Sequence, residues 1–401
     1  MREAVIVDAI RTPIGRGKPG GALSGWHPAD LLGEVLKALV DRTGIDPAQI
    51  DDVITGCVSQ AGEQAFNIAR HGVLAAGFPE SVPATSVDRQ CGSSQQAVHF
   101  AAQGVMAGVY DIVIAAGVES MSRVPMFSSA QGKDPAGPKV AERYRDRGGL
   151  VNQGISAELI AAKWGLSRRA VDEFSAESHR RAAEATAAGY FDREIVPVAV
   201  DRGEGRTDEL LKSDEGIRPE TTPEILGGLK PAFYSEELAQ RYPELPWVVT
   251  AGNASQISDG AAAVLIMSAE RARQLGLTPR AAIRHFAVVG DDPVLMLTGV
   301  IPATHRILER AGMTMADIDA FEVNEAFAPV LLAWEKETGA DMSKVNVHGG
   351  AIANGHPLGA SGAKLMATLL NVLERTGGRF GLQTMCEGGG MANATIIERL
   401  G

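Results

Sequence analysis

The chain has 401 residues, of which 45% are hydrophobic and 22% are charged. These proportions are ordinary for a globular protein with a substantial core, so they exclude a disordered chain. The formal net charge of −11 argues against a nucleic-acid surface, because phosphate binding needs clustered Lys and Arg. At roughly 150 residues per domain, the length predicts two or three domains.

Cysteine usage and hydropathy indicate a reducing compartment. The cysteines number only three, Cys57, Cys91 and Cys386, and a sparse, odd-numbered set does not fit a secreted disulfide framework. The first apolar run contains Asp8 and lacks the long hydrophobic region of a signal peptide. No run of 18 apolar residues is present, so a membrane-spanning helix is not expected. We therefore expect a cytoplasmic location.

Short β-branched runs alternate with Ala-rich stretches in the first 120 residues. The pattern predicts, in chain order, a strand at 4–8, a helix at 28–40, strands at 52–57 and 84–87, a helix at 95–108 that ends at a glycine, and a strand at 111–116. Such alternation is typical of parallel sheets with helices on both faces.

The alternation of β-branched and Ala-rich stretches is lost between residues 121 and 250. This part contains a Gly/Pro/Lys stretch at 131–139 and a polar run at 201–223. A long loop-rich insertion of this kind is more often functional than decorative. We expect residues 121–250 to form an inserted loop subdomain that acts as a lid.

The α/β texture returns after residue 280, with strands predicted at 281–288, 318–323 and 383–386 and a helix at 361–375. Two short motifs form a weak internal repeat, since Cys91-Gly-Ser-Ser and His356-Pro-Leu-Gly each open a helix that leads to a glycine-rich strand end. The prediction is a layered α/β fold of two similar halves. Residues 1–120 with 251–276 make the first half, and residues 277–401 make the second.

Cys91 is the first candidate for chemistry. It follows the strand predicted at 84–87 and lies just before a helix. The positive end of a helix dipole lowers a thiol pKa toward the nucleophilic thiolate, so we expect that effect here. The alternative, a buried structural cysteine, is the interpretation that we keep for Cys57.

A histidine among glycines is the second candidate. His356 lies in the segment 348–362, where glycines allow close approach of backbone and ligand. A structural role for His356 is the competing interpretation, and His348 is given no chemical role.

Two further motifs end strands of the second half. Cys386 precedes Gly388, Gly389 and Gly390, whose backbone is able to aim N–H groups into an oxyanion hole. Asn324 begins the segment Asn-Glu-Ala-Phe-Ala, where its amide is either a helix N-cap or a group that holds a catalytic water.

These motifs together resemble the thiolases, that is, acetyl-CoA acetyltransferases and 3-ketoacyl-CoA thiolases. The resemblance runs from Val5-Ile-Val-Asp-Ala-Ile-Arg-Thr-Pro through Thr250-Ala-Gly-Asn-Ala-Ser to Cys386-Glu-Gly-Gly-Gly-Met. Four motifs in the same order are far more specific than any one of them. The resemblance implies a thiolase-like αβαβα fold with an inserted loop subdomain.

The resemblance also implies a role for each motif. Cys91 would be the acyl-accepting nucleophile and His356 the base that activates it. Cys386 would handle the α-proton of the second substrate. Asn324 would hold a water in one oxyanion hole together with His356, and the N–H groups of Cys91 and Gly388 would form the other.

Coenzyme A enters through the same resemblance as a co-substrate, with no prosthetic group and no metal expected. Ser255 and Arg218 match positions that contact coenzyme A in relatives, and Leu229-Lys-Pro-Ala-Phe matches part of the loop domain that cradles it. The expected partners are acyl-CoA thioesters, coenzyme A and further copies of the chain in a homodimer or homotetramer. No nucleic acid or membrane partner is expected.

The implied reaction is cleavage of a 3-ketoacyl-CoA by coenzyme A to acetyl-CoA and a shortened acyl-CoA, or the reverse condensation. The segments 58–67 and 89–96 are more similar to thiolases that degrade long or bulky chains, including steroids. Asn354 and Ser94 depart from the commonest pattern without removing a catalytic group. The alternatives are a biosynthetic acetoacetyl-CoA thiolase, a condensing enzyme of fatty-acid synthesis, a cysteine hydrolase and an inactive acyl-CoA-binding relative.

Overall fold

Strands from both halves of the chain join in one sheet, which the computed structural model describes within residues 2–401. The strand order is β10-β11-β12-β9-β1-β8-β5-β3-β4, and β2 pairs with β8. The strands are β1 (Ala4–Arg11), β2 (Gly15–Arg16), β3 (Asp52–Gly56), β4 (Ala84–Val87), β5 (Ile112–Ser120), β8 (Ser258–Ser268), β9 (Ala281–Gly290), β10 (Ala320–Val323), β11 (Phe380–Glu387) and β12 (Met391–Arg399).

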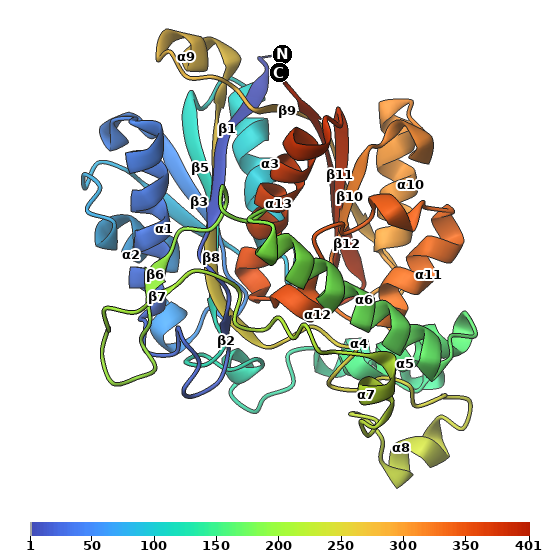
Figure 1. Cartoon of the computed structure of the whole chain (residues 1–401). Helices are drawn as coiled ribbons and strands as arrows, with labels where there is room; N and C mark the ends of the chain where they lie inside the picture. The colour runs from blue at the N-terminus through green and yellow to red at the C-terminus, as the bar shows by residue number, and fades with distance from the viewer. Residues whose placement is uncertain (1) are drawn as a thin grey trace.

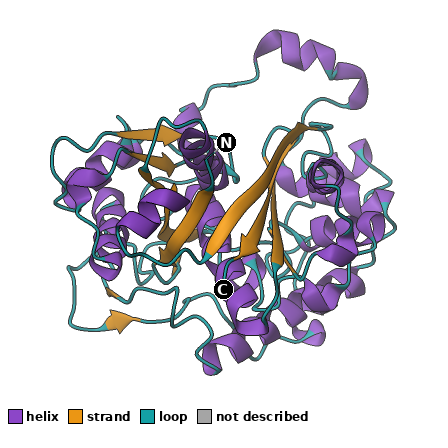
Figure 2. Ribbon diagram, turned by 90° about the horizontal axis from the view of Figure 1, so that it is seen from above, coloured by secondary structure: helices purple, strands orange, loops and turns teal. Residues whose placement is uncertain are grey.

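The two halves meet at a narrow junction in this sheet. Strand β1 pairs with β9 through Val5 and Ala282 and through Ile6 and Ala281 only. Seen from above, the strands run through the middle of the molecule and the helices lie on either side (Figure 2). Each half therefore supplies one part of the sheet, and the two parts are joined through this short pairing and through the apolar core that they share.

Helices make the other layers of the fold (Figure 1). They are α1 (Pro28–Thr43), α2 (Ile68–Ala75), α3 (Ser93–Met106), α9 (Ala269–Gln274), α10 (Val300–Ala311), α11 (Ala328–Thr338), α12 (Ala351–Asn354) and α13 (Ser361–Thr376). Helices α1 and α2 cover the outer face of the first sheet, and α10 and α11 cover that of the second. Helices α3 and α13 lie between the sheets in a shared apolar core. The predicted layered α/β fold is confirmed.

The two central helices approach each other very closely. A Cβ atom at Gly362 would lie 2.2 Å from the backbone nitrogen of Gln95, so only glycine fits there. Next to this contact, the hydroxyl of Ser94 accepts a hydrogen bond from the N–H of Ala363 at 2.9 Å. Ser94, which departs from the commonest thiolase pattern, thus joins α3 to α13.

The prediction of parallel sheets is only partly right. Strands β4, β3 and β5 run parallel, as do β10 and β11. Strand β8 is antiparallel to both β1 and β5, and β12 is antiparallel to both β9 and β11. The parallel strands are linked by crossover helices, whereas a short turn between β11 and β12 reverses the chain directly.

The internal repeat extends well beyond the two short motifs. The first half runs β1-α1-β3-α2-β4-α3-β5-β8, and the second runs β9-α10-β10-α11-α13-β11-β12 apart from short elements. In this order α3 corresponds to α13, so the turn that carries Cys91 corresponds to the turn that follows His356.

The segment 121–257 contains more helix than a loop subdomain suggests. Its elements are α4 (Gly137–Arg143), α5 (Gln153–Lys163), α6 (Arg168–Ala187), α7 (Pro223–Gly227), α8 (Glu236–Arg241), β6 (Val198–Ala199) and β7 (Leu210–Leu211). Buried Arg11 of β1 anchors the segment, because its guanidinium donates to Glu194 and to Asp214 at 2.7 Å each. Within residues 2–401, no helix is both long and apolar enough to cross a membrane.

Candidate active site

Four segments from the two halves carry the candidate residues. Cys91 lies between β4 and α3, and His356 lies between α12 and α13. Cys386 is near the end of β11, and Asn324 directly follows β10. Because β10 and β11 are parallel neighbours, with the N–H of Asn324 bonded to the carbonyl of Thr384 at 3.1 Å, Asn324 and Cys386 come together at one edge.

The turn before α3 presents Cys91. Gln90 has φ +47°, a left-handed conformation that non-glycine residues seldom adopt. The hydroxyl of Ser93 accepts the N–H of Arg89 at 2.9 Å and donates to the carbonyl of Gln90 at 2.6 Å, which locks the turn. Strain of this kind, held by surrounding bonds, is typical of functional turns. Cys91 itself is only 4% exposed.

The predicted lowering of the Cys91 pKa is wrong for the site without ligand. Burial raises the pKa of the Cys91 thiol well above its usual range, and Cys386 and Glu387 nearby raise the pKa further. Desolvation of the thiolate therefore outweighs the effect of the helix N-terminus. The thiol carries its proton at neutral pH and needs a base that removes it.

The hydrogen bonds of His356 define its tautomer. Its Nδ1 lies 2.6 Å from the hydroxyl oxygen of Ser361, and that hydroxyl donates its own proton to the carbonyl of Pro357 at 2.8 Å. Since a hydroxyl has one proton, Nδ1–H of His356 must donate to Ser361. The lone pair is then on Nε2, which is buried without a hydrogen-bond partner among residues 2–401.

This imidazole is neutral at pH 7, because burial and, to a smaller extent, the charge of Lys364 lower the pKa of His356 to about 3. The backbone N–H of His356 donates to the Ser258 hydroxyl at 2.9 Å, which holds the backbone of His356 in place. A neutral imidazole with a free Nε2 is a proton acceptor. Sequence reasoning missed Ser361 and Ser258, although Ser361 lies in the same motif as His356.

Cys386 and Asn324 form the other part of the site. Burial raises the pKa of the Cys386 thiol, the amide of Asn324 beside it opposes that rise, and the resulting pKa is about 12. Both amide atoms of Asn324 are buried and lack a well-aligned hydrogen bond within residues 2–401. Buried polar atoms without partners are costly, so they mark a position where a ligand completes the bonding.

Two adjoining cavities open onto these segments. One has a volume of about 380 Å³ and is lined by Cys91 and by Leu358, two residues after His356. The other has a volume of about 360 Å³ and is lined by Gly388. Gln90, Phe127 and Gln153 are the residues that line both.

A buried carboxylate that sequence reasoning missed holds two of these segments together. Glu119 of β5 accepts backbone N–H groups from Val58 and Ser59 in the first half and from Gly359 in the second, at 2.8–3.0 Å. Gln64 donates to the same carboxylate at 2.8 Å. Glu119 thereby joins a wall of the Cys91 cavity to the turn after His356.

The two predicted coenzyme A contacts lie apart from these cavities. Ser255 is half-buried, and its N–H donates to the carbonyl of Ala326, two residues after Asn324, at 2.9 Å. Arg218 is exposed, and its backbone N–H donates to Nδ1 of His179 in α6 at 3.1 Å. Neither residue lines the two cavities beside Cys91.

Known proteins match the chain over its whole length. The thiolase N-terminal domain family matches residues 4–270, and the thiolase C-terminal domain family matches residues 277–399. A steroid 3-ketoacyl-CoA thiolase, FadA6, of Mycobacterium tuberculosis is 50% identical, over 100% of this chain and 95% of the relative. A 3-ketoacyl-CoA thiolase of Erwinia tasmaniensis is 48% identical, over 100% of both chains.

Solved structures agree with these sequence matches. The acetyl-CoA acetyltransferase of Bacillus anthracis superposes with a TM-score of 0.88 at 38% identity, over 100% of this chain and 99% of the other. Human mitochondrial 3-ketoacyl-CoA thiolase in complex with CoA superposes with a TM-score of 0.87 at 35% identity, over 100% and 98%. The resemblance seen in the four motifs is confirmed, and the chain belongs to the thiolase family.

Proposed function

We propose that this thiolase works in the degradative direction, cleaving 3-ketoacyl-CoA with coenzyme A to acetyl-CoA and a shortened acyl-CoA. The observation that carries the chemistry is the tautomer of His356, whose free Nε2 is available beside the turn that lines the Cys91 cavity. The degradative direction is supported by the relatives that are named 3-ketoacyl-CoA thiolases. A buried thiol of high pKa needs such a base for nucleophilic catalysis, and we assign that part to His356.

In the first half-reaction the Cys91 proton passes to Nε2 of His356, and the sulfur attacks the 3-keto carbon. The resulting alkoxide is stabilised by hydrogen-bond donors, for which the N–H groups of Cys91 and Gly388 are our assignment. The Cα–Cβ bond then breaks, and the thioester on Cys91 forms. The electron pair remains as the enolate of acetyl-CoA, and the thiol of Cys386 protonates its carbon.

Asn324 contributes to the enolate step in this proposal. Its amide lies beside Cys386 and has free hydrogen-bonding capacity. We assign it to a water that, held with His356, donates to the thioester oxygen as negative charge develops there. Proton transfer from His356 to the Cys386 thiolate restores both groups after acetyl-CoA leaves.

In the second half-reaction coenzyme A gives its thiol proton to His356 and attacks the thioester on Cys91. The tetrahedral intermediate collapses, the shortened acyl-CoA forms, and Cys91 leaves as a thiolate that takes the proton back from His356. Proton and electron counts close over the cycle. The covalent intermediate predicts ping-pong kinetics.

Ser255 and Arg218 are our candidates for coenzyme A contacts. The exposed guanidinium of Arg218 is suited to a phosphate.

The adjoining cavities support a long or bulky acyl group. Their linings include apolar side chains, among them Val58, Met126, Leu358, Met296 and Met391. The relative from Mycobacterium tuberculosis is named a steroid 3-ketoacyl-CoA thiolase. We therefore place fatty or steroid-type chains ahead of acetoacetyl-CoA as substrates.

The first test is the loss of absorbance of the magnesium-enolate form of 3-ketoacyl-CoA after coenzyme A is added. Wild-type protein is expected to cleave long or bulky substrates faster than acetoacetyl-CoA, and Cys91→Ala is expected to lower kcat by at least about 10⁴-fold, because the covalent step disappears. A faster rate on acetoacetyl-CoA would favour the biosynthetic alternative. Absence of cleavage for every chain length would refute the proposed activity.

We also propose that the chain acts as a homodimer or homotetramer. Strand β4 ends the sheet order, so within residues 2–401 it is paired on one side only. Phe66, on the loop before α2, is 92% exposed. A strand edge that is paired on one side only is able to pair with a second copy of the chain, and a contact between copies would cover the exposed ring of Phe66. Sedimentation equilibrium is expected to give a multiple of the 42.1 kDa chain mass, and a monomer at micromolar concentration would contradict this.

A cytoplasmic location remains a prediction. It is supported by the three cysteines, all of which are buried and free. Thiols persist in a reducing compartment.

A further inference from the structure

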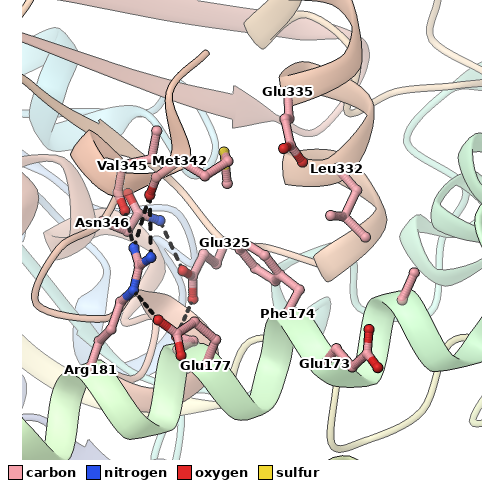
Figure 3. Close-up of a pocket in the computed structure, with 12 residues that line it drawn as sticks. Glu173, Phe174, Glu177, Arg181, Glu325, Leu332, Glu335, Met342, Val345 and Asn346 are labelled. Atoms are coloured by element: carbon pink, nitrogen blue, oxygen red, sulfur yellow. Dashed lines mark hydrogen bonds and ion pairs between the residues drawn. The ribbon is translucent and has the colours of Figure 1, made fainter. Parts of the chain in front are cut away.

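Glu325, the residue after Asn324, has a buried side chain that the mechanism above does not use. It lies at a cavity of about 280 Å³ between α6 and α11, on the side of Asn346 (Figure 3). Burying a carboxylate is costly unless hydrogen bonds satisfy it, so its partners should reveal its purpose.

Three hydrogen bonds end on this carboxylate. Oε1 accepts from the amide of Asn346 at 2.9 Å. Oε2 accepts from the hydroxyl of Ser178 at 2.7 Å and from the backbone N–H of Ile352 at 3.2 Å. Each partner donates, and the Ser178 oxygen in turn accepts the N–H of Gly350 at 3.0 Å. Both oxygens therefore act as acceptors. Burial raises the pKa of the Glu325 carboxyl, and the three donors oppose that rise because they stabilise the charged form.

One of these bonds leads to Asn324. The amide oxygen of Asn346 accepts the N–H of Val323 at 2.9 Å, and its amide nitrogen donates to the carbonyl of Val323 at 2.9 Å. Val323 directly precedes Asn324 in the chain. Glu325 therefore orients the side-chain amide of Asn346, and that amide holds the backbone at Val323, just before Asn324.

The other two bonds lead toward His356. Ile352 belongs to α12, the single helical turn that ends one residue before Gly355-His356. A Cβ atom at Gly350 would lie 2.1 Å from the carboxyl carbon of Glu325, so this close approach requires glycine. The carboxylate thus fixes the start of the loop whose end carries His356.

We propose that Glu325 is a positioning residue for the thiolase reaction, which sets Asn324 and His356 relative to each other through Asn346, Ile352 and Ser178. The inference rests on the proposed function, because it assigns Glu325 a part in that reaction. The residue Ser178 lies on α6 next to His179, whose Nδ1 accepts the backbone N–H of Arg218. The same carboxylate therefore also ties the segment with a candidate coenzyme A contact to the reacting groups.

The change Glu325→Gln tests this with little loss of volume. If the new carbonyl oxygen takes the place of Oε2, the new NH₂ group faces the NH₂ group of Asn346. Asn346 is unable to turn over without losing its bond to the N–H of Val323. The substitution therefore displaces the backbone at Asn324 or leaves two donors in opposition.

The experiment measures thiolysis by wild type, Glu325→Gln, Ser178→Ala and Glu335→Gln. Glu335 is the matched control, since it lines the same cavity from α11 away from these bonds (Figure 3). Rates are divided by the amount of Cys91 that reacts with iodoacetamide, so that misfolded protein does not count. Melting temperatures and KM for coenzyme A are measured in parallel.

For Glu325→Gln we expect kcat per reactive Cys91 to fall roughly 100-fold with KM for coenzyme A within about threefold of wild type, since displacements near 1 Å cost this much. Ser178→Ala should fall between wild type and Glu325→Gln, and Glu335→Gln should match wild type. An unchanged kcat per reactive Cys91 in both Glu325→Gln and Ser178→Ala would overturn the inference while wild type still cleaves substrate. An inactive wild type would instead refute the proposed function and, with it, this inference.

Discussion

His356→Gln is expected to lower kcat for thiolysis by roughly 10³-fold, within the range that loss of a general base causes. The reason is that the Cys91 thiol carries its proton at neutral pH, so it needs a base. Burial raises the pKa of the Cys91 thiol, so the proton does not leave to water at neutral pH, and our mechanism assigns its removal to Nε2 of His356, which has no hydrogen-bond partner within residues 2–401. The rate is measured with the magnesium-enolate assay at saturating substrate.

His348→Gln provides the matched control for this variant. His348 is also buried and also in the glycine-rich segment, but its Nε2 accepts from Arg375 at 3.1 Å and its ring stacks on Tyr190. Alkylation of Cys91 by iodoacetamide should slow in His356→Gln and not in His348→Gln. A His356→Gln enzyme with more than about a tenth of wild-type kcat would rule out His356 as the base.

The same variant should also change how stability depends on pH. The pKa of His356 is about 3 in the folded protein against 6.5 for the free group, so the unfolded chain binds more protons between these values. Stability is therefore complete above about pH 6.5 and decreases on acidification, by at most about 1.4 kcal/mol per pH unit for this group. Urea unfolding at pH 6.5 and 5 should show a smaller difference in His356→Gln than in wild type.

Cys386→Ala is expected to separate the two kinds of chemistry at the site. Carbon–carbon cleavage should fall by roughly 10³-fold, because the enolate of acetyl-CoA loses its proton donor. Transfer of an acyl group from a simple acyl-CoA to Cys91 breaks no carbon–carbon bond and needs no proton on carbon. That partial reaction should continue at a rate close to wild type.

The two reactions are measured by the enolate assay and by mass spectrometry of the protein after incubation with acetyl-CoA. Cys57→Ala is the control, since Cys57 is equally buried, its sulfur accepts from Gln64 at 3.4 Å, and our mechanism gives it no role. Equal loss of acylation and cleavage in Cys386→Ala would show that Cys386 supports Cys91 rather than the α-carbon.

The placement of the candidate residues was accessible from sequence because polar residues at strand ends and glycine-rich turns are local patterns. Cys91 and Cys386 both lie at such positions, and the structure puts them close enough for Cys386 to raise the Cys91 pKa. The pKa itself was predicted with the wrong sign. Burial comes from Met121, Leu358 and Met385, which are distant along the chain and which no local pattern connects to Cys91.

The insertion and the sheet directions were harder to predict for related reasons. Helix α6 has a highly charged sequence, so its narrow buried side gave no clear apolar periodicity. Strand β8 is buried along its whole length and is mostly apolar, which hides the alternation that marks a strand. Strand β12 buries Asn393 and Thr395 together with its apolar residues, so one face of it is not set apart by polarity. Contacts between distant segments decide both cases.

The position of β8 also has a consequence for synthesis on the ribosome. This strand pairs with β1 on one side and β5 on the other, yet it comes after the whole segment 121–257. A nascent chain that has released only its first 250 residues lacks the centre of its first sheet, and β1 and β5 each expose an unpaired edge. Such edges are prone to aggregation, so folding of the first half must wait until residue 268 has emerged.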